Sequence, residues 1–248
     1  MIQIKTSRDK APEQTEHSSG CLICGDELIY QATHSNYTCA ICGQAGSSNV
    51  ACPKAHYVCD SCHSDRAVLS VMAMLHRSDS KDPIELLEQA FADPLVFMHG
   101  PEHHTIVPYV LLTAYKNAGG PIDSAKAMRE GYQRSKKVPG GVCGAWGVCG
   151  AQIGAGIFAS IVTGSNPLNK EAWGIPMKLT ARILERLSEI GGPRCCKRTT
   201  RIAIEEAAKF SEETLGIKMD CSSVACVHAD RNRQCIGRSC PYHPRTKA

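Results

Sequence analysis

The stretch VPGGVCGAWGVCGAQIGAGIFASIVTGSNPLN, residues 138–169, contains no Asp, Glu, Lys or Arg, and the rest of the chain is organised around it. Its first part is rich in glycine and carries two cysteines, Cys143 and Cys149. In its second part, residues 150–163, small residues recur four positions apart, which predicts a buried helix that another helix approaches closely. A backbone with few side chains beside two thiols is suited to a buried cluster, a metal or a small ligand.

The composition of the whole chain favours a reduced, metal-binding protein. The chain has 248 residues, a net charge of +4 at pH 7 and 15 cysteines. The odd number of cysteines and the polar start, which lacks an apolar signal region, argue against a secreted disulfide framework and predict a cytoplasmic location. The mild positive charge does not favour nucleic acid as a partner. The predicted helix over 150–163 is shorter than the ~20 residues that cross a membrane, so we expect no membrane association.

The distribution of the cysteines divides the chain into four parts. We expect a disordered leader over residues 1–20, a zinc-binding module over 21–64, a helical domain over 65–220 and a cysteine-rich metal-binding tail over 221–248. The predicted fold class is therefore mainly α, with a small zinc-ribbon or RING-like module at the N-terminal end. Apolar periodicity and helix-start residues predict helices in the following places: Ser64 or Asp65 to Arg77, 84–92, Pro101 towards Gly119, 124–135, 150–163, 178–190 and one from Pro193.

The N-terminal module carries metal-ligating side chains in four pairs: Cys21, Cys24, Cys39, Cys42, Cys52, His56, Cys59 and Cys62. Its repeated Cys-x-x-Cys-Gly turn lets two thiolates bind one metal while backbone amides point at the sulfurs. Tetrahedral zinc needs four ligands, so we expect two zinc ions, with a rubredoxin-like iron site at the first two pairs as the minor alternative. The spacing allows sequential sites, the first four ligands and then the last four. It also allows interleaved sites, as in cross-braced RING-type modules: Cys39, Cys42, Cys59 and Cys62 in one, and Cys21, Cys24, Cys52 and His56 in the other.

The segment MHGPEHH, residues 98–104, places three histidines and a glutamate at a helix start: His99, Glu102, His103 and His104. A neutral imidazole both ligates metals and accepts protons near neutral pH, so these residues are candidate catalytic groups. The alternative is that they cap and pack the start of the helix.

The segment GGPRCCKR, residues 191–198, supplies two more thiols, Cys195 and Cys196, at a predicted helix start. Helix amides and the nearby cations favour the thiolate form, and those cations are Arg194, Lys197, Arg198 and Arg201. With Cys143 and Cys149 they make four thiols, the number that a [4Fe-4S] cluster uses. Arg194 and Arg198 would then balance the charge of the cluster. Alternative uses are redox chemistry by neighbouring thiols, binding of a small anionic ligand by the arginines, or simple packing of the thiols as small apolar groups.

The tail carries a further four-cysteine set with the spacing C-x4-C-x8-C-x4-C, made of Cys221, Cys226, Cys235 and Cys240. No apolar periodicity lies between these cysteines, which indicates a loop-rich segment organised by metal. Zinc and an iron-sulfur cluster both remain open here.

Four segments resemble an uncharacterised cysteine-rich domain family of anaerobic bacteria and archaea, whose members are sometimes fused to SAM-dependent methyltransferase domains. The segments are MHGPEHH at 98–104, VPGGVCGAWGVCG at 138–150, GGPRCCKR at 191–198 and CPYH at 240–243. The resemblance spans about residues 20–243 and implies anaerobic metabolism and a partner enzyme in methyl transfer. The chain carries no methyltransferase motif of its own.

Three functional hypotheses follow. In the leading one, a cytoplasmic protein with structural zinc binds a [4Fe-4S] cluster in its helical domain and serves a redox or methyl-transfer partner enzyme. In the second, every metal site is structural zinc and the protein binds another protein or a nucleic acid. In the third, the protein is a thiol- or metal-dependent enzyme whose small anionic substrate is held by Arg194, Arg198 and Arg201.

Overall fold

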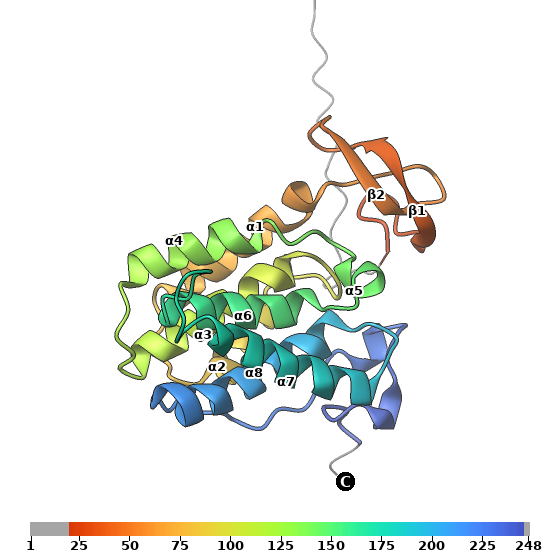
Figure 1. The fold of residues 1–248 in the computed structure, drawn as a ribbon. Coiled ribbons are helices and arrows are strands. Elements are labelled where there is room, and N and C mark those ends of the chain that lie inside the picture. The colour runs from red at the N-terminus through yellow and green to blue at the C-terminus, as the bar shows by residue number, and fades with distance from the viewer. Residues whose placement is uncertain (1–19, 246–248) are drawn as a thin grey trace, which may run out of the picture.

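A computed structural model describes residues 20–245 of the protein as a small β-hairpin module placed at one end of a helical body (Figure 1). Within these residues there are eight α-helices and one two-stranded sheet. The predicted class, mainly α with a small cysteine-bearing module at the N-terminal end, is confirmed at this level. The predicted leader over residues 1–20 lies, except for its last residue, outside the described residues.

The N-terminal module is built on strands β1 (Ile29–Thr38) and β2 (Ala45–Ala51), which pair antiparallel with an irregularity between Tyr30 and Ser35. Almost every residue of β1 is exposed. An isolated two-stranded hairpin with no buried face is only marginally stable in water. The module therefore needs another source of stability, and its two Cys-x-x-Cys turns lie directly before β1 and between the strands.

The helical body follows the sequence prediction closely, with the largest differences at helix starts. Its helices are α1 (Asp60–Leu75), α2 (Pro83–Ala92), α3 (Glu102–Asn117), α4 (Ser124–Ser135), α5 (Val142–Ala145), α6 (Gly150–Val162), α7 (Gly174–Ile190) and α8 (Cys196–Phe210). Helix α1 starts directly after Cys59 and not at Ser64 or Asp65, and α7 starts at Gly174 and not at Lys178. The single turn α5 was not predicted.

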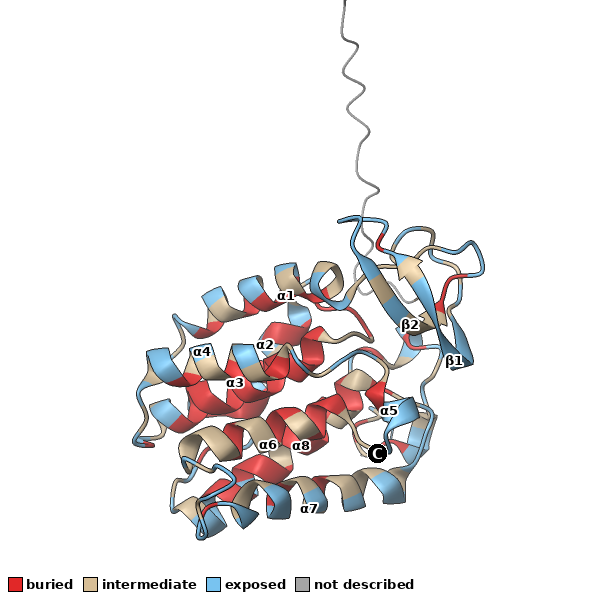
Figure 2. Cartoon of the chain, turned by 45° about the horizontal axis from the view of Figure 1, so that its top comes forward, coloured by how far each residue is buried: buried red, intermediate tan, exposed pale blue. Residues whose placement is uncertain are grey.

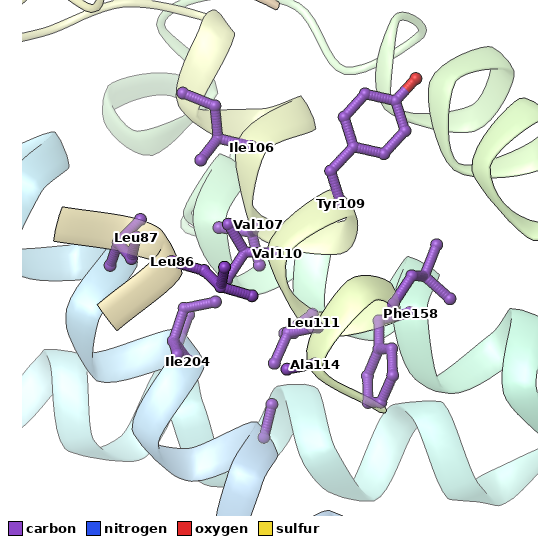
Figure 3. Close-up of a cluster of buried hydrophobic side chains, with 14 of the residues drawn as sticks. Leu86, Leu87, Ile106, Val107, Tyr109, Val110, Leu111, Ala114, Phe158 and Ile204 are labelled. Atoms are coloured by element: carbon purple, nitrogen blue, oxygen red, sulfur yellow. The ribbon is translucent and has the colours of Figure 1, made fainter. Parts of the chain in front are cut away.

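Helix α3 is the centre of the body. Every residue from Glu102 to Tyr115 is buried, because α1, α2, α4, α6 and α8 all pack against this helix. Figure 2 shows its continuous burial, and Figure 3 shows its side chains meeting those of α2, α6 and α8. A helix that is buried on all sides fixes the positions of the helices around it.

Helix α6 approaches α3 closely through its small residues, as the sequence predicts. A Cβ atom on Gly154 would lie 2.8 Å from the backbone oxygen of His104 and 3.0 Å from Cβ of Val107. A Cβ atom on Gly150 would lie 2.1 Å from the His104 ring. The uncharged stretch is therefore buried where it meets the start of α3.

The tail, after α8 and the short π-helical segment Ser211–Leu215, returns across the body without an α-helix in its described part. Its backbone is held by hydrogen bonds from Ser222 N to Asp82 Oδ2 at 2.8 Å and from Cys226 N to Tyr242 O at 2.7 Å. This path brings Cys226, Cys235 and Cys240 to the start of α8, where they line a cavity with Cys195. Over residues 20–245, no helix combines the length and the apolar character needed to cross a membrane.

The close contact of α3 and α6 predicts the effect of a larger side chain. We expect Gly154→Val to lower the free energy of unfolding by about 1–3 kcal/mol or more, because the added atoms meet the α3 backbone. Gly174→Val is the matched control, since nothing lies within 4 Å of its Cβ position, and it should change the stability by less than about 0.5 kcal/mol. Urea unfolding followed by circular dichroism measures both. Equal stability of the two variants would contradict the close packing.

Candidate functional site

The N-terminal module brings its eight ligands together as two sets of four. One set is Cys21, Cys24, Cys52 and His56, and the other is Cys39, Cys42, Cys59 and Cys62. Within each set, all four ligand atoms lie within 4.8 Å of one another. The ligands are therefore interleaved along the chain, as in a cross-braced module, and the sequential alternative is excluded by the geometry.

The distances within both sets fit a tetrahedral metal ion. Cys24 Sγ lies 3.5 Å from Cys52 Sγ, and Cys42 Sγ lies 3.7 Å from Cys59 Sγ. These separations are close to the roughly 3.8 Å edge of a tetrahedron with ~2.3 Å metal-sulfur bonds. They are far longer than a disulfide bond of about 2.05 Å. Both sets can therefore hold a metal ion.

Backbone amides support the sulfurs of both sets, as expected for thiolate ligands. Ile23 N donates to Cys21 Sγ and Lys54 N donates to Cys52 Sγ, both at 3.4 Å. Burial raises the pKa of Cys39, but backbone hydrogen bonds, led by that from Cys59, outweigh it and lower that pKa to about 6. Such amides favour the deprotonated sulfur that a metal binds.

The start of α1, which carries the last candidate ligands of the module, is joined to α3 by a buried charge. His63, directly after the metal ligand Cys62, places Nδ1 3.2 Å from Glu102 Oε2 at the start of α3. His103 Nδ1 lies 3.3 Å from the other carboxylate oxygen. Glu102 is fully buried, and although burial raises its pKa, His63 and His103 together outweigh this and hold the pKa well below its usual range. The same carboxylate raises the pKa of His63 against the effect of burial.

The three histidines at 98–104 line a cavity, and some of them also make structural contacts. His104 Nδ1 lies 3.2 Å from the backbone oxygen of Val138, so this ring ties the beginning of the uncharged stretch to α3. His99, His103 and His104 line a cavity of about 780 Å³ between the module and the helical body. Glu102 is not among the residues that line it. Its contacts connect α1 to α3, while its candidate role as a proton-transfer group stays a prediction.

This cavity brings together all six residues for which the sequence predicts cofactor binding: Cys143, Cys149, Arg194, Cys195, Cys196 and Arg198. Cys149 and Cys195 precede α6 and α8 as N-cap residues, and Cys196 is the first residue of α8. The opposite wall comes from the N-terminal module and includes Tyr30 and Asn49. No motif marks Tyr30, yet the Arg194 guanidinium lies 4.9 Å from the centre of its ring.

The four thiols that line the large cavity differ in their neighbours. Burial and then the charge of Cys149 raise the pKa of Cys143. Burial raises the pKa of Cys196 to about 12, with Arg194 acting against it and Cys149 with it. Cys195 instead interacts with the tail. Burial raises its pKa, Arg198 acts against burial, and the thiols of Cys226 and Cys240 raise the pKa further. Cys143, Cys149 and Cys196 therefore interact with one another, while Cys195, which lines both cavities, also interacts with the tail thiols. The predicted cluster set Cys143, Cys149, Cys195 and Cys196 stays a prediction.

Fewer cations are available to a ligand in the cavity than the sequence predicts, because most of the positive side chains bond to other groups of the protein. Arg198 Nη2 donates to the backbone oxygens of Gly191 and Pro193, at 2.9 and 2.8 Å. Lys197 Nζ donates to Val96 O at 3.2 Å, and Arg201 forms a bidentate pair with Glu88 at 2.7 Å for both bonds. Arg201 does not line the large cavity, so of the three proposed substrate arginines only Arg194 and Arg198 do.

His99 is held in one tautomer beside the cavity. Its Nε2 lies 3.3 Å from Asn232 Oδ1, an acceptor, so Nε2 carries the proton. Burial lowers the pKa of His99 to about 3, and the charge of Arg194 lowers it further, so the ring is neutral. Among the described residues, its buried Nδ1 has no hydrogen-bond partner. That nitrogen has a lone pair available for a metal or a proton. Asn232 carries no sequence signal for this role.

The tail cysteines lie at a second, smaller cavity. Cys226, Cys235 and Cys240 line it together with Cys195. Cys221 is exposed and is not among the lining residues of that cavity.

Removal of the buried carboxylate tests the connection between module and body. We expect Glu102→Ala to lower the free energy of unfolding by about 3–5 kcal/mol, because it leaves His63 and His103 buried without their charged partner. Glu189→Ala, an exposed change on α7, is the control and should alter it by less than about 0.5 kcal/mol. Urea unfolding near neutral pH measures both. A loss below about 1 kcal/mol for Glu102→Ala would show that the pair does not hold the two parts together.

Comparison with known proteins assigns the helical body and the tail to a family. Residues 71–243 match a family described as "Family of unknown function (DUF5714)". Comparisons with curated proteins and with solved structures found no match. The matched segment begins inside α1, after the last ligand of the N-terminal module, and contains both cavity-lining cysteine groups. In agreement with the resemblance of its sequence to an uncharacterised family, the chain belongs to the DUF5714 family of unknown function.

Proposed function

We propose that this protein is a redox metalloprotein that holds two zinc ions in its N-terminal module and a [4Fe-4S] cluster in the large cavity. Cys143, Cys149 and Cys196 are the cluster ligands, and His99 is the fourth. The observation that carries the proposal is that three thiols from two distant segments line one cavity beside a neutral imidazole with an available nitrogen.

Ligand spacing supports a cluster, and not a single ion, in the cavity. Among residues 20–245, only the two N-terminal sets bring three or more ligand atoms within 4.8 Å of one another. A single zinc ion requires that closeness, whereas a cluster of four irons holds its ligands further apart. The cavity thiols are therefore spaced too widely for one zinc ion in the conformation described.

The protonation of the thiols argues against a thiol-dependent enzyme that works without metal. A nucleophilic cysteine has a lowered pKa, whereas burial raises the pKa of both Cys143 and Cys196. A metal that replaces the proton removes this difficulty, because ligating thiols are deprotonated on binding.

The cavity leaves room for a small molecule beside the cluster. Its volume of about 780 Å³ lies within the ~300–1,000 Å³ range of small-molecule sites. Arg194 is the cation that lines the cavity next to Cys143 and Cys196, so a small anionic ligand is the favoured class. The role in the cell is then electron transfer with such a ligand or with a partner enzyme, of the redox or methyl-transfer kind that the sequence resemblance implies.

Zinc in the N-terminal module has a structural role in this proposal. Both ligand sets are closed, with four protein ligands each, and leave no position for a substrate. The module contributes Tyr30, Asn49 and His56 to the cavity wall. Zinc binding thus positions a cover over the cluster and limits the access of water to it.

Metal and sulfide analysis of anaerobically purified full-length protein tests the proposal. We expect about two zinc ions per chain, together with iron, acid-labile sulfide and the visible absorption of an iron-sulfur cluster. Cys143→Ala/Cys149→Ala should lower the iron and sulfide contents while leaving zinc unchanged. His99→Ala should shift the reduction potential of the remaining cluster or reduce its occupancy. A colourless protein that contains zinc alone would overturn the cluster assignment.

A further inference from the structure

The start of α8 carries two consecutive cysteines whose side chains have different neighbours. Cys196 lies with Cys143 and Cys149 at the large cavity, whereas Cys195 lies with Cys226 and Cys240. Cys195, Cys226, Cys235 and Cys240 all line a second cavity of about 20 Å³. This group is not a sequence motif, because Cys195 comes from a different part of the chain and takes the place that the tail spacing gives to Cys221.

The sulfurs of this second group receive backbone hydrogen bonds of the same kind as those of the N-terminal ligands. His228 N donates to Cys226 Sγ and Gly237 N donates to Cys235 Sγ, both at 3.4 Å and both from two residues further along the chain. Burial raises the pKa of Cys240, and a backbone hydrogen bond from Tyr242, again two residues on, acts against it. Cys21 and Cys52 show the same pattern in the N-terminal module.

The fourth sulfur, that of Cys195, accepts hydrogen bonds from two groups. Arg198 N at the start of α8 donates to Cys195 Sγ at 3.4 Å, and Asn232 Nδ2 donates to it at the same distance. Asn232 is buried, and its Oδ1 is the atom that contacts His99 at the large cavity. Each of the four thiols thus accepts an amide hydrogen bond, and such bonds favour the thiolate that a metal binds.

Positive charge lies next to the same group. Lys197, Arg198 and Arg201 line the second cavity. Burial lowers the pKa of Arg201, but Glu88 and, after it, the charge of Cys226 outweigh this and raise it. A tetrathiolate metal centre is anionic, and buried cations beside it offset its charge.

The arrangement of the sulfurs favours a cluster over a single metal ion. No three of these four sulfurs lie within 4.8 Å of one another, although both N-terminal sets in the same chain do. The four thiols line one cavity but do not converge closely enough to bind a single tetrahedral ion in this conformation. We propose that Cys195, Cys226, Cys235 and Cys240 bind a second [4Fe-4S] cluster, next to the large cavity.

The two centres are coupled through the chain itself. Cys195 and Cys196 are consecutive, so their Cα atoms are about 3.8 Å apart. The two cavities share Cys195 and Arg198 among their lining residues. Asn232 contacts a ligand of each centre. The site is therefore placed to exchange electrons with the large cavity, and it exists whether or not that cavity holds a cluster.

Two double variants of the full-length chain, purified anaerobically and analysed for iron, sulfide and zinc, test this site. Cys226→Ala/Cys235→Ala should lose about half of the iron and sulfide of the wild type and keep its zinc. Cys221→Ala, an exposed change in the same tail, is the matched control and should keep all of its iron. Unchanged iron in Cys226→Ala/Cys235→Ala, or the loss of one zinc ion in its place, would overturn the proposal.

The second double variant, Cys143→Ala/Cys149→Ala, leaves the tail intact and decides the case if the tail variant does not fold. About four iron and four sulfide ions per chain should remain in it, with the electron paramagnetic resonance signal of a reduced cluster. Complete loss of iron from this variant, with the fold retained by circular dichroism, would overturn the second site. Iron equal to that of the wild type would instead refute the cluster in the large cavity, so the two proposals fail separately.

Discussion

The carboxylate of Glu102 makes the buried charged contact that joins the start of α1, where the N-terminal module ends, to the central helix. An ionised group taken fully out of water is tolerated only when partners surround it, and here the partners come from α1 and α3. Gly100 leaves the space for this contact, since a Cβ atom there would lie 2.1 Å from Glu102 Oε2 and 2.5 Å from His63 Cε1. His63 follows Cys62 directly. The position of Cys62, a candidate metal ligand, is thereby tied to the central helix.

The helical body was largely predictable because its signals are local. Asp82 caps α2 through Ile84 N and Glu85 N as its position before Pro83 predicts, and α4 has the predicted bounds. The pairing of the metal ligands was not predictable, since the spacing allows both sequential and interleaved sets. The path of β1 and β2 decides between them. The start of α1 was missed because Cys59 occupies the N-cap position, where the sequence gives no capping signal.

The grouping of the cavity-lining thiols could not be read from the sequence for a different reason. The neighbours Cys195 and Cys196 appear equivalent in the sequence, but one is the N-cap residue of α8 and the other its first helical residue, so their side chains leave the helix in different directions. The return of the tail then supplies partners for Cys195 from about 30 or more residues away. Asn232 and Tyr30 contribute to the sites through contacts that have no local pattern.

The two kinds of thiol site match the different needs of the two parts of the chain. The hairpin module has almost no buried side chains of its own, and its candidate ligands converge as closely as binding of a single metal ion requires. The body is held together by the fully buried α3 and does not need metal for its core. Its cysteines lie at the edge of that core, at the starts of α6 and α8, where they are spaced around cavities. Thiols that do not stabilise the fold can bind a cofactor instead. We therefore expect the chemistry of the protein at the cavities and not in the N-terminal module.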